Sequence, residues 1–308
     1  MTVKVKSMNK NSGRIMAKDQ TAQGHTIDAN ARRLATMRAN LTALETRAAE
    51  LLAKGDSMTE GERLQLLALV NIAYHTSGKI EGAASIDGSA ACGFCEKMRG
   101  AAANNVLIIC GMCYAAADSW KEAAWRRHQL NARILSSVLF TKEELARLAI
   151  PSSVCRINED GDTVNETHAR NILRIIETHS WAAFGYWFKN DAAVAAGLKA
   201  EGVTDNAERR RRYNARFVQS SVLIGFPARP RWFADVVFTV WPNKETTEKA
   251  ILAGAWECNG RKCAECGWNC YRAGKNAEGA QHVAEYLRTN KAQRAAVMEA
   301  YTAGKARV

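Results

Sequence analysis

Apolar and polar positions along this chain follow two different periods. Between residues 28 and 55, leucine, methionine and alanine recur every three or four positions, which predicts a long helix with a coiled-coil-like apolar seam. Thr59 followed by Glu62 is typical of a helix start and predicts a second helix to about Tyr74. The two segments together predict an N-terminal helical hairpin over residues 28–76.

Further along the chain, the pattern predicts an α/β core. Residues 77–113 are rich in small residues and cysteine, and we expect them to be mostly loop. After Pro151, predicted strands and helices alternate, as is typical of parallel strands joined by crossover helices. The predicted strands cover residues 153–157, 182–188, 217–224 and 236–241, and the predicted helices cover residues 114–138, 142–149, 166–177, a region up to 212, and 244–254. We therefore expect a partial barrel or an open parallel sheet within a cysteine-rich domain of residues 77–272, followed by C-terminal helices over residues 273–308.

The charge of the chain points to an acidic partner. The net charge is +12, and the first 54 residues, which begin with a predicted basic flexible arm over residues 1–27, hold ten basic and four acidic residues. Such a balance attracts nucleic acid, although a solvated basic tail explains it equally well. The run Arg209, Arg210, Arg211 and Arg212 has two similar interpretations, a clamp for phosphates or a solvated helix face.

We expect this chain to lie in a reducing cytoplasm. No apolar stretch approaches the length of about 18 residues that a membrane span needs, and the polar N-terminus lacks the apolar segment of a secretory signal. Paired cysteines in such a compartment indicate metal rather than disulfides. The apolar seam of the first helix also allows pairing with a second copy of the chain, as a homodimer.

Eight of the nine cysteines form two sets with the spacing of metal ligands. The first set consists of two C-x2-C knuckles separated by fourteen residues, Cys92, Cys95, Cys110 and Cys113. The second set lies within thirteen residues and consists of Cys258, Cys263, Cys266 and Cys270. Four thiolates suit zinc and a [4Fe–4S] cluster equally well. Cys155 stands alone in an apolar strand, and we expect it to be a core residue.

An Asp-Gly-Asp turn, residues 160–162, follows the first strand of the alternating series. Functional sites in parallel sheets gather at this edge, but such turns are also common for backbone reasons alone.

Several short segments together resemble the phage "gene product eighty-eight" domain family. They are residues 79–82, Cys110 to Ala115, residues 156–162, 184–189 and 217–221, and the motif Cys263-x2-Cys266-x3-Cys270-Tyr271. The resemblance covers about residues 77–272. Family members commonly space the first cysteines more widely and end the last motif with C-x2-C-Trp, so the resemblance leaves the exact ligands open.

The strand–helix order resembles in turn the radical-SAM half barrel, in which three cysteines hold a [4Fe–4S] cluster whose open iron binds S-adenosylmethionine. This analogy implies that Gly161 and Asp162 lie near the amino group of S-adenosylmethionine. The usual C-x3-C-x2-C motif is missing, since position 106 is Val106, so the first site is open only if three of its four cysteines bind.

Two functions are therefore predicted as alternatives. One is an iron–sulfur, radical-SAM-like enzyme of a phage or mobile element that acts on nucleic acid or protein. The other is a non-catalytic zinc protein that binds nucleic acid or a partner protein.

Overall fold

The computed structural model describes residues 35–88, 93–112, 122–159, 161–258, 262–265, 270–271, 281–287 and 291–305. The chain divides into two compact units, Met1–Thr46 and Arg47–Val308. In the first unit, residues 35–46 are helical, as the apolar seam predicts. The predicted arm over residues 1–27 and the predicted start of the seam helix lie outside the described residues.

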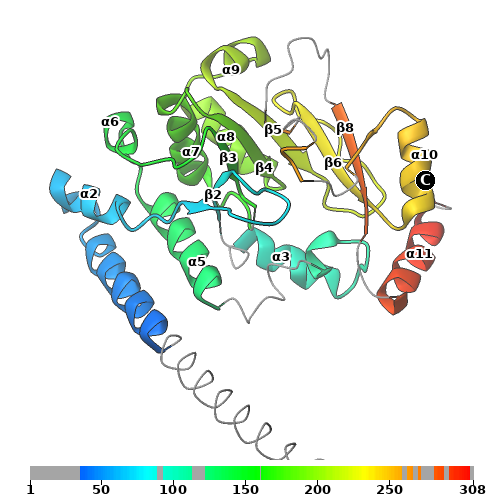
Figure 1. The fold of residues 1–308 in the computed structure, drawn as a ribbon, viewed down its shortest axis with the longest axis horizontal. Helices are drawn as coiled ribbons and strands as arrows, with labels where there is room; N and C mark the ends of the chain where they lie inside the picture. The colour runs from blue at the N-terminus through cyan, green and yellow to red at the C-terminus, as the bar shows by residue number, and fades with distance from the viewer. Residues whose placement is uncertain are drawn as a thin grey trace, which may run out of the picture. The chain divides into compact units, whose positions relative to one another are not determined.

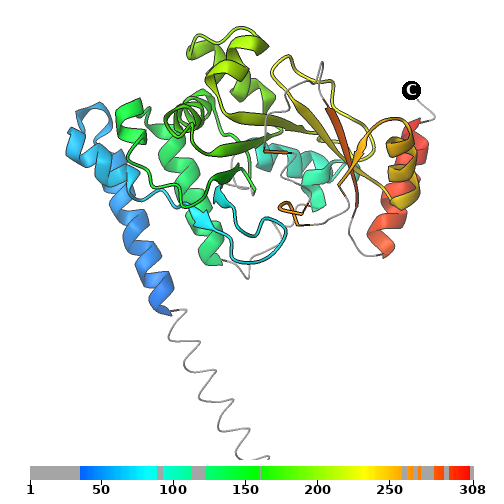
Figure 2. The same cartoon turned by 45° about the horizontal axis from the view of Figure 1, so that its top comes forward.

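The second unit contains one sheet of eight strands (Figures 1 and 2). The strands are β1 (Ala73–Tyr74), β2 (Ala84–Ile86), β3 (Val154–Ile157), β4 (Ala183–Phe188), β5 (Ala215–Ser220), β6 (Val236–Trp241), β7 (Trp256–Glu257) and β8 (Gln281–Tyr286). They lie in the order β1-β2-β3-β4-β5-β6-β8-β7, and only β1 is antiparallel to its neighbour. Figure 2 shows that successive strands are rotated relative to one another, which is the usual twist of a sheet.

Helices alternate with the strands of the second unit, so the predicted α/β fold class is confirmed. The described helices are η1 (Gly55–Ser57), α2 (Glu60–Leu67), α3 (Gly93–Ala102), η2 (Ile109–Met112), α5 (Glu122–Ser137), α6 (Lys142–Leu145), α7 (Glu166–Thr178), α8 (Asp191–Ala200), α9 (Asn206–Arg212), α10 (Lys244–Leu252) and α11 (Lys291–Lys305). In the described part of the chain, none of the helices has both the length and the apolar character that crossing a membrane requires.

Side-chain caps explain why the helices begin where they do. Asn165, Asn190, Asp205 and Asn243 each accept a hydrogen bond from a backbone N–H in the first turn of α7, α8, α9 and α10. These bonds satisfy donors that have no partner inside the helix. The Thr59 box predicted from the sequence is present at the start of α2.

The strand order separates two faces of the sheet. Because β2 to β6 are adjacent in chain order, right-handed crossovers place all their connecting helices on one face. In agreement, α5 packs against α7 and α7 against α8, and Figure 1 shows these helices together along β3 and β4. Arg209 of α9 lies over the ring of Phe217 on β5, so Phe217 points to this helix-covered face. We call the opposite side the open face.

The connection from β7 to β8 runs in the reverse direction. β8 is inserted between β6 and β7, so a right-handed connection from β7 back to β8 crosses on the open face. This connection contains the second cysteine set. The topology therefore brings the described cysteines of this set, Cys258, Cys263 and Cys270, to the face that the crossover helices leave uncovered.

Three of the predicted elements are wrong. The second helix ends at Leu67, and Ala73–Tyr74 form β1, so the predicted hairpin over residues 28–76 is not entirely helical. The segment 77–113, predicted as loop, contains β2 and α3. Residues 281–286 form β8, although the C-terminal segment 273–308 was expected to be helical. These short strands gain ladder hydrogen bonds from their neighbours, which outweighs weak local preferences.

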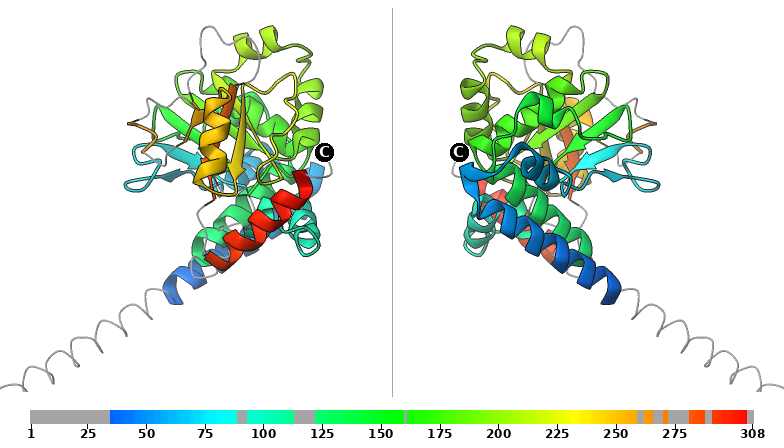
Figure 3. Two further views of the ribbon diagram at one scale, coloured as in Figure 1. Left: turned by 90° about the vertical axis from the view of Figure 1, so that its right-hand side faces the viewer. Right: turned by 90° about the vertical axis from the view of Figure 1, so that its left-hand side faces the viewer.

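The last helix agrees with the prediction, since Val297 and Tyr301 of α11 are buried. Figure 3 shows α10 and α11 at the end of the sheet that holds β8. The ring of Tyr301 occupies the place where a side chain at Gly225 would lie, because a Cβ there would come within 2.4 Å of the ring.

Candidate metal centre and adjoining pocket

A row of residues across the open face combines two arginines and a glycine. Arg156 on β3 is paired in register with Gly185 on β4, and Gly185 with Arg216 on β5. Since neighbours in register point to the same side of a sheet, the two guanidinium groups flank a position that has no side chain. Phe184 and Tyr186, on either side of Gly185 in the chain, point to the helix-covered face.

The end of the second cysteine set lies directly on this glycine. A Cβ at position 185 would come within 2.9 Å of Cδ1 of Tyr271 and 3.0 Å of the carbonyl oxygen of Cys270. A residue larger than glycine would therefore push the Cys270–Tyr271 segment away from the sheet. The absence of a side chain at Gly185 allows the cysteine loop to rest on the strands.

The three described cysteines of the second set share their packing neighbours. Cys263 packs in a buried cluster with Tyr271, and Cys270 contacts the same cluster. Cys270 and Cys258 both contact a second cluster, formed by Val218, Val236 and Val283. The structure thus brings Cys258, Cys263 and Cys270 to one region of the open face, whereas Cys266 lies outside the described residues.

Lys79, near the start of the predicted cysteine-rich domain, also contacts this group of cysteines. Lys79 Nζ lies 3.2 Å from Cys258 Sγ and 3.3 Å from Glu285 Oε1, and its carbonyl oxygen accepts a bond of 2.7 Å from the N–H of Cys263. Burial opposes the charge of this lysine, but Glu285 and the Cys258 sulfur raise the pKa of Lys79. Lys79 is therefore a cation that contacts both the Cys258 sulfur and the Glu285 carboxylate.

Burial and charged neighbours act in opposite directions on the Cys270 thiol. Burial, followed by the nearby Cys258 and Cys263, raises the pKa of Cys270 to about 12, while Arg156 and Arg216 act in the opposite direction. A bound metal replaces the thiol proton, and three cations then face the resulting negative charge. Trp187, whose ring lies 4.3 Å from the Arg156 guanidinium, has a buried Nε1–H with no hydrogen-bond partner among the described residues. Donors of this kind bind the sulfurs of iron–sulfur clusters, so the residues fit such a group.

The described thiols of the second set lie in one region, but they do not converge on a single point as the ligands of a metal ion do. Within the described ranges, no three side chains of His, Cys, Asp or Glu converge as metal ligands do. The fourth cysteine of the second set lies outside those ranges. Cys155, in contrast, is fully buried in β3, where burial strongly raises the pKa of its thiol.

The first cysteine set lies on different elements. Cys92 and Cys113 are outside the described residues, Cys95 lies on α3, and Cys110 is buried on η2. The η2 segment is tied to the chain that follows β5, because Ile109 N donates to the carbonyl oxygen of Val222 at 2.9 Å. This part of the first set is therefore fixed at the carboxyl end of β5.

A pocket of about 730 Å³ opens at the same edge of the sheet. Its lining includes residues just after β4 and β5, such as Lys189 and Val222, and Met98 on α3. Met98 follows Cys95 by one helical turn. In parallel sheets, ligands bind at the carboxyl ends of the strands, and a pocket of this size matches a small ligand.

Gly161 and Asp162 have a structural explanation. Gly161 has a φ of 83°, a left-handed conformation that glycine adopts at little cost. The carboxylate of Asp162 is fully buried and accepts hydrogen bonds from the backbone N–H groups of Thr163, Lys189 and Asn190. Burial raises the pKa of Asp162, although Lys189 and these N–H groups oppose that change. The carboxylate joins two loops instead of facing the pocket, so it does not fit a contact to S-adenosylmethionine.

The arginine run is divided between two environments. Arg209 is fully buried and donates to Asp235 at 2.6 Å, and burial lowers the pKa of Arg209. Arg212 lies 3.0 Å from Glu177. Arg210 and Arg211 have exposed side chains, so a phosphate that approaches α9 meets these two first.

The sequence patterns assign no role to Lys79, Arg156, Arg216, Trp187 or Glu285, although the first, second and fourth of these lie in segments of the family resemblance. They are scattered over more than 200 positions and meet only because the strands are adjacent. One pattern does distinguish the arginines, since each interrupts an otherwise apolar strand, in VCRI and ARFV. A charged residue in such a strand indicates a buried partner of opposite charge. Comparison with protein-family models, with curated proteins and with solved structures gives no match for this chain.

Proposed function

We propose that this chain is an iron–sulfur enzyme of a phage or mobile element, and that Cys258, Cys263, Cys266 and Cys270 hold one of two cysteine-ligated centres. The observation that carries the proposal is the gathering of three of these cysteines among Lys79, Arg156 and Arg216. Arg216 is buried, Lys79 and Arg156 are half-buried, and a nearby negative charge stabilises cations that are removed from water. A cluster or ion with four thiolate ligands supplies that charge.

The reaction takes place, in this proposal, at the pocket beside the first cysteine set. The sequential strand order supports a half-barrel-like arrangement, in which Cys92, Cys95, Cys110 and Cys113 belong to the connection after the first parallel strand. S-adenosylmethionine is the cofactor that the radical-SAM resemblance implies, and it would supply radical chemistry when bound. The residues lining the pocket, and not Asp162, are the ones placed to orient a substrate there.

The same proposal bears on the cellular compartment and the oligomeric state of the protein. Thiolate ligands of this kind require a reducing compartment, which is the host cytoplasm for a phage protein. Pairing of two copies through the seam helix stays a prediction.

The first test is the metal and acid-labile sulfide content of protein purified without oxygen. The proposal expects iron with an equal amount of sulfide. Zinc without sulfide would replace the enzyme by the non-catalytic zinc protein, and the absence of any metal would overturn both functions.

Serine variants of single cysteines test which cysteines hold each centre. Cys263→Ser and Cys270→Ser should each lose the iron and sulfide of one centre, whereas Cys155→Ser, buried in β3, should keep both. Equal losses in all three variants would mean that the cysteines only support folding. Cys92→Ser should retain iron if three thiolates hold the first centre, and lose it if four do.

A further inference from the structure

The pocket at the carboxyl edge has a strongly basic lining. Lys189, Arg229 and Arg231 contribute to its wall, and Asp191 is the acidic residue among its lining residues. Arg231 forms an ion pair with Asp191. Arg229 is exposed, and within the described residues its guanidinium makes no hydrogen bond or ion pair. The pocket therefore offers an available guanidinium in a positive surrounding, which suits a phosphate group.

An exposed aromatic ring stands next to this charge. Trp232 lines the pocket and is 45 % exposed. Its ring lies perpendicular to that of the buried Phe233, at 5.3 Å between centroids and an interplanar angle of 90°. This contact fixes the orientation of Trp232 and leaves part of its ring open to solvent. Exposed aromatic rings beside basic side chains are typical of surfaces that stack nucleobases.

The loop that carries both groups, residues 226–232, is held in place by hydrogen bonds to Gln219 and Ser221. Gln219 on β5 donates to the carbonyl oxygen of Arg229 at 3.3 Å and accepts from the N–H of Arg231 at 3.0 Å. Ser221 accepts from the N–H of Ala228 at 2.8 Å. Pro227 and Pro230 further restrict this backbone. Ordering the loop in advance lowers the entropy lost on binding.

We propose that this pocket binds a nucleotide unit, with its phosphate at Arg229 and its base stacked on Trp232. The unit comes either from a free nucleoside phosphate or from a single strand of nucleic acid. The inference rests on the proposed function only in taking the pocket as the substrate site. This site differs in location from the one predicted at the arginine run. The run lies on α9, at the amino end of β5, whereas the pocket lies at the carboxyl end of β5.

The test uses the full-length protein and a fluorescein-labelled single-stranded oligonucleotide, titrated by fluorescence anisotropy at several salt concentrations. Arg229→Gln should weaken binding and lower the slope of log K against log salt by about 0.7, the value for one phosphate contact on a single strand. Trp232→Leu should weaken binding roughly tenfold through the loss of stacking. Arg211→Gln and Trp181→Leu are matched controls, because both residues are exposed at the amino ends of strands, and they should bind as the wild type does.

Each outcome decides the inference. Weaker binding by Arg211→Gln, with Arg229→Gln unchanged, would transfer the site to α9 and overturn the proposal, as would the absence of salt-sensitive binding. Competition by adenosine monophosphate would identify free nucleotides as the source, and binding of the strand alone would identify nucleic acid. Metal and sulfide are measured on the same preparations, so a zinc protein that binds through Arg229 would retain this inference while the proposed enzyme fails.

Discussion

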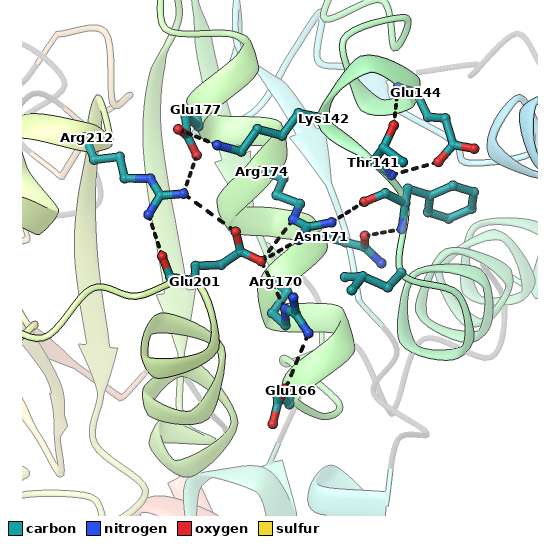
Figure 4. A network of polar contacts seen from close by, with 12 residues as sticks. Thr141, Lys142, Glu144, Glu166, Arg170, Asn171, Arg174, Glu177, Glu201 and Arg212 are labelled. Carbon is teal, nitrogen blue, oxygen red and sulfur yellow. Dashed lines mark hydrogen bonds and ion pairs between the residues drawn. The ribbon is translucent and has the colours of Figure 1, made fainter.

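The two faces of the sheet balance their buried cations with different partners. In the helix layer, each of the three arginines labelled in Figure 4 pairs with a carboxylate. Glu201 accepts from Arg170 and from Arg174, at 2.9 Å in both cases, and lies 3.6 Å from Arg212. Arg212 also reaches Glu177 at 3.0 Å. The charges of this layer are balanced by the protein itself.

On the open face, neutral side chains and cysteine sulfur contact the cations in addition to carboxylates, since Lys79 also pairs with Glu285. Arg156 lies over the Trp187 ring, Arg216 donates to the amide of Gln281 at 3.3 Å, and Lys79 contacts Cys258. Burial lowers the pKa of Arg216, with Asp235 and Cys270 acting against this change. A carboxylate pairs with each arginine labelled in Figure 4, whereas cysteine sulfur and neutral side chains also surround the cations of the open face, where we propose the anionic centre.

The largest effect that we predict is a loss of stability when Glu201, in the helix layer, loses its charge. Its side chain is 5 % exposed, and Glu201→Gln removes the charge that faces three arginines. Breaking a buried ion pair typically costs about 3–5 kcal/mol, so the free energy of unfolding in urea should fall by that order. The iron and sulfide content should not change, because no cysteine contacts this network in the described structure.

Glu245→Gln is the matched control for this variant. Glu245 is 70 % exposed and pairs with Lys249 on the surface of α10, so Glu245→Gln should unfold at nearly the same urea concentration as the wild type. An equal, small effect of both variants would show that the two faces do not differ in the way described.

The helix-covered face could largely be predicted from the sequence. The apolar spacing of Ile172, Leu173 and Ile176 gives α7 a single buried side, and Asn165 marks its start. The strand β4 is long enough, at six residues, for its apolar character to be recognised. Local patterns of this kind act over a few residues and are visible without the fold.

The open face depends on contacts that local patterns do not contain. β1 has two residues and β2 has three, too few to show any period. β8 has the sequence QHVAEY, whose polar residues also fit a helix, and it is a strand because β6 and β7 pair with it on both sides. The cysteine spacings predict a set of metal ligands, but the position of Arg156 and Arg216 around Gly185 follows from strand register alone.

A pair of glycines tests the two faces with the same substitution. At Gly197, where α8 meets α7, a Cβ would come within 2.5 Å of the Ala169 Cβ, and at Gly185 within 2.9 Å of Tyr271. Inserting a methyl group into either contact should cost about 1–3 kcal/mol. Only Gly185→Ala should also lower the iron and sulfide content, since it displaces the Cys270–Tyr271 segment.

Unfolding in urea and metal analysis distinguish these outcomes. Gly100→Ala serves as the control, because nothing lies within 4 Å of its Cβ, and alanine in a helix should stabilise by about 0.5–1 kcal/mol. Metal loss in Gly197→Ala to the same extent as in Gly185→Ala would mean that metal binding reports global stability and not the open face.

The smallest expected effect is a pH dependence that originates in the helix layer. His168 on α7 is buried, and its Nδ1 accepts a hydrogen bond from the N–H of Val164 at 3.1 Å. Burial lowers the pKa of His168 to about 4, whereas in the unfolded chain it is about 6.5. As the pH falls between these values, the unfolded chain binds a proton that the folded protein does not. Stability from this group is therefore present above pH 6.5 and falls by at most about 1.4 kcal/mol per pH unit below it.

Urea unfolding at pH 7, 6 and 5 measures this slope. In His168→Gln the slope should be smaller than in the wild type by about 1 kcal/mol per unit. Iron release is followed in the same samples. If the slope disappears with the metal and persists in His168→Gln, then the acid sensitivity belongs to the open face, and the helix layer is not the part of the molecule that senses pH.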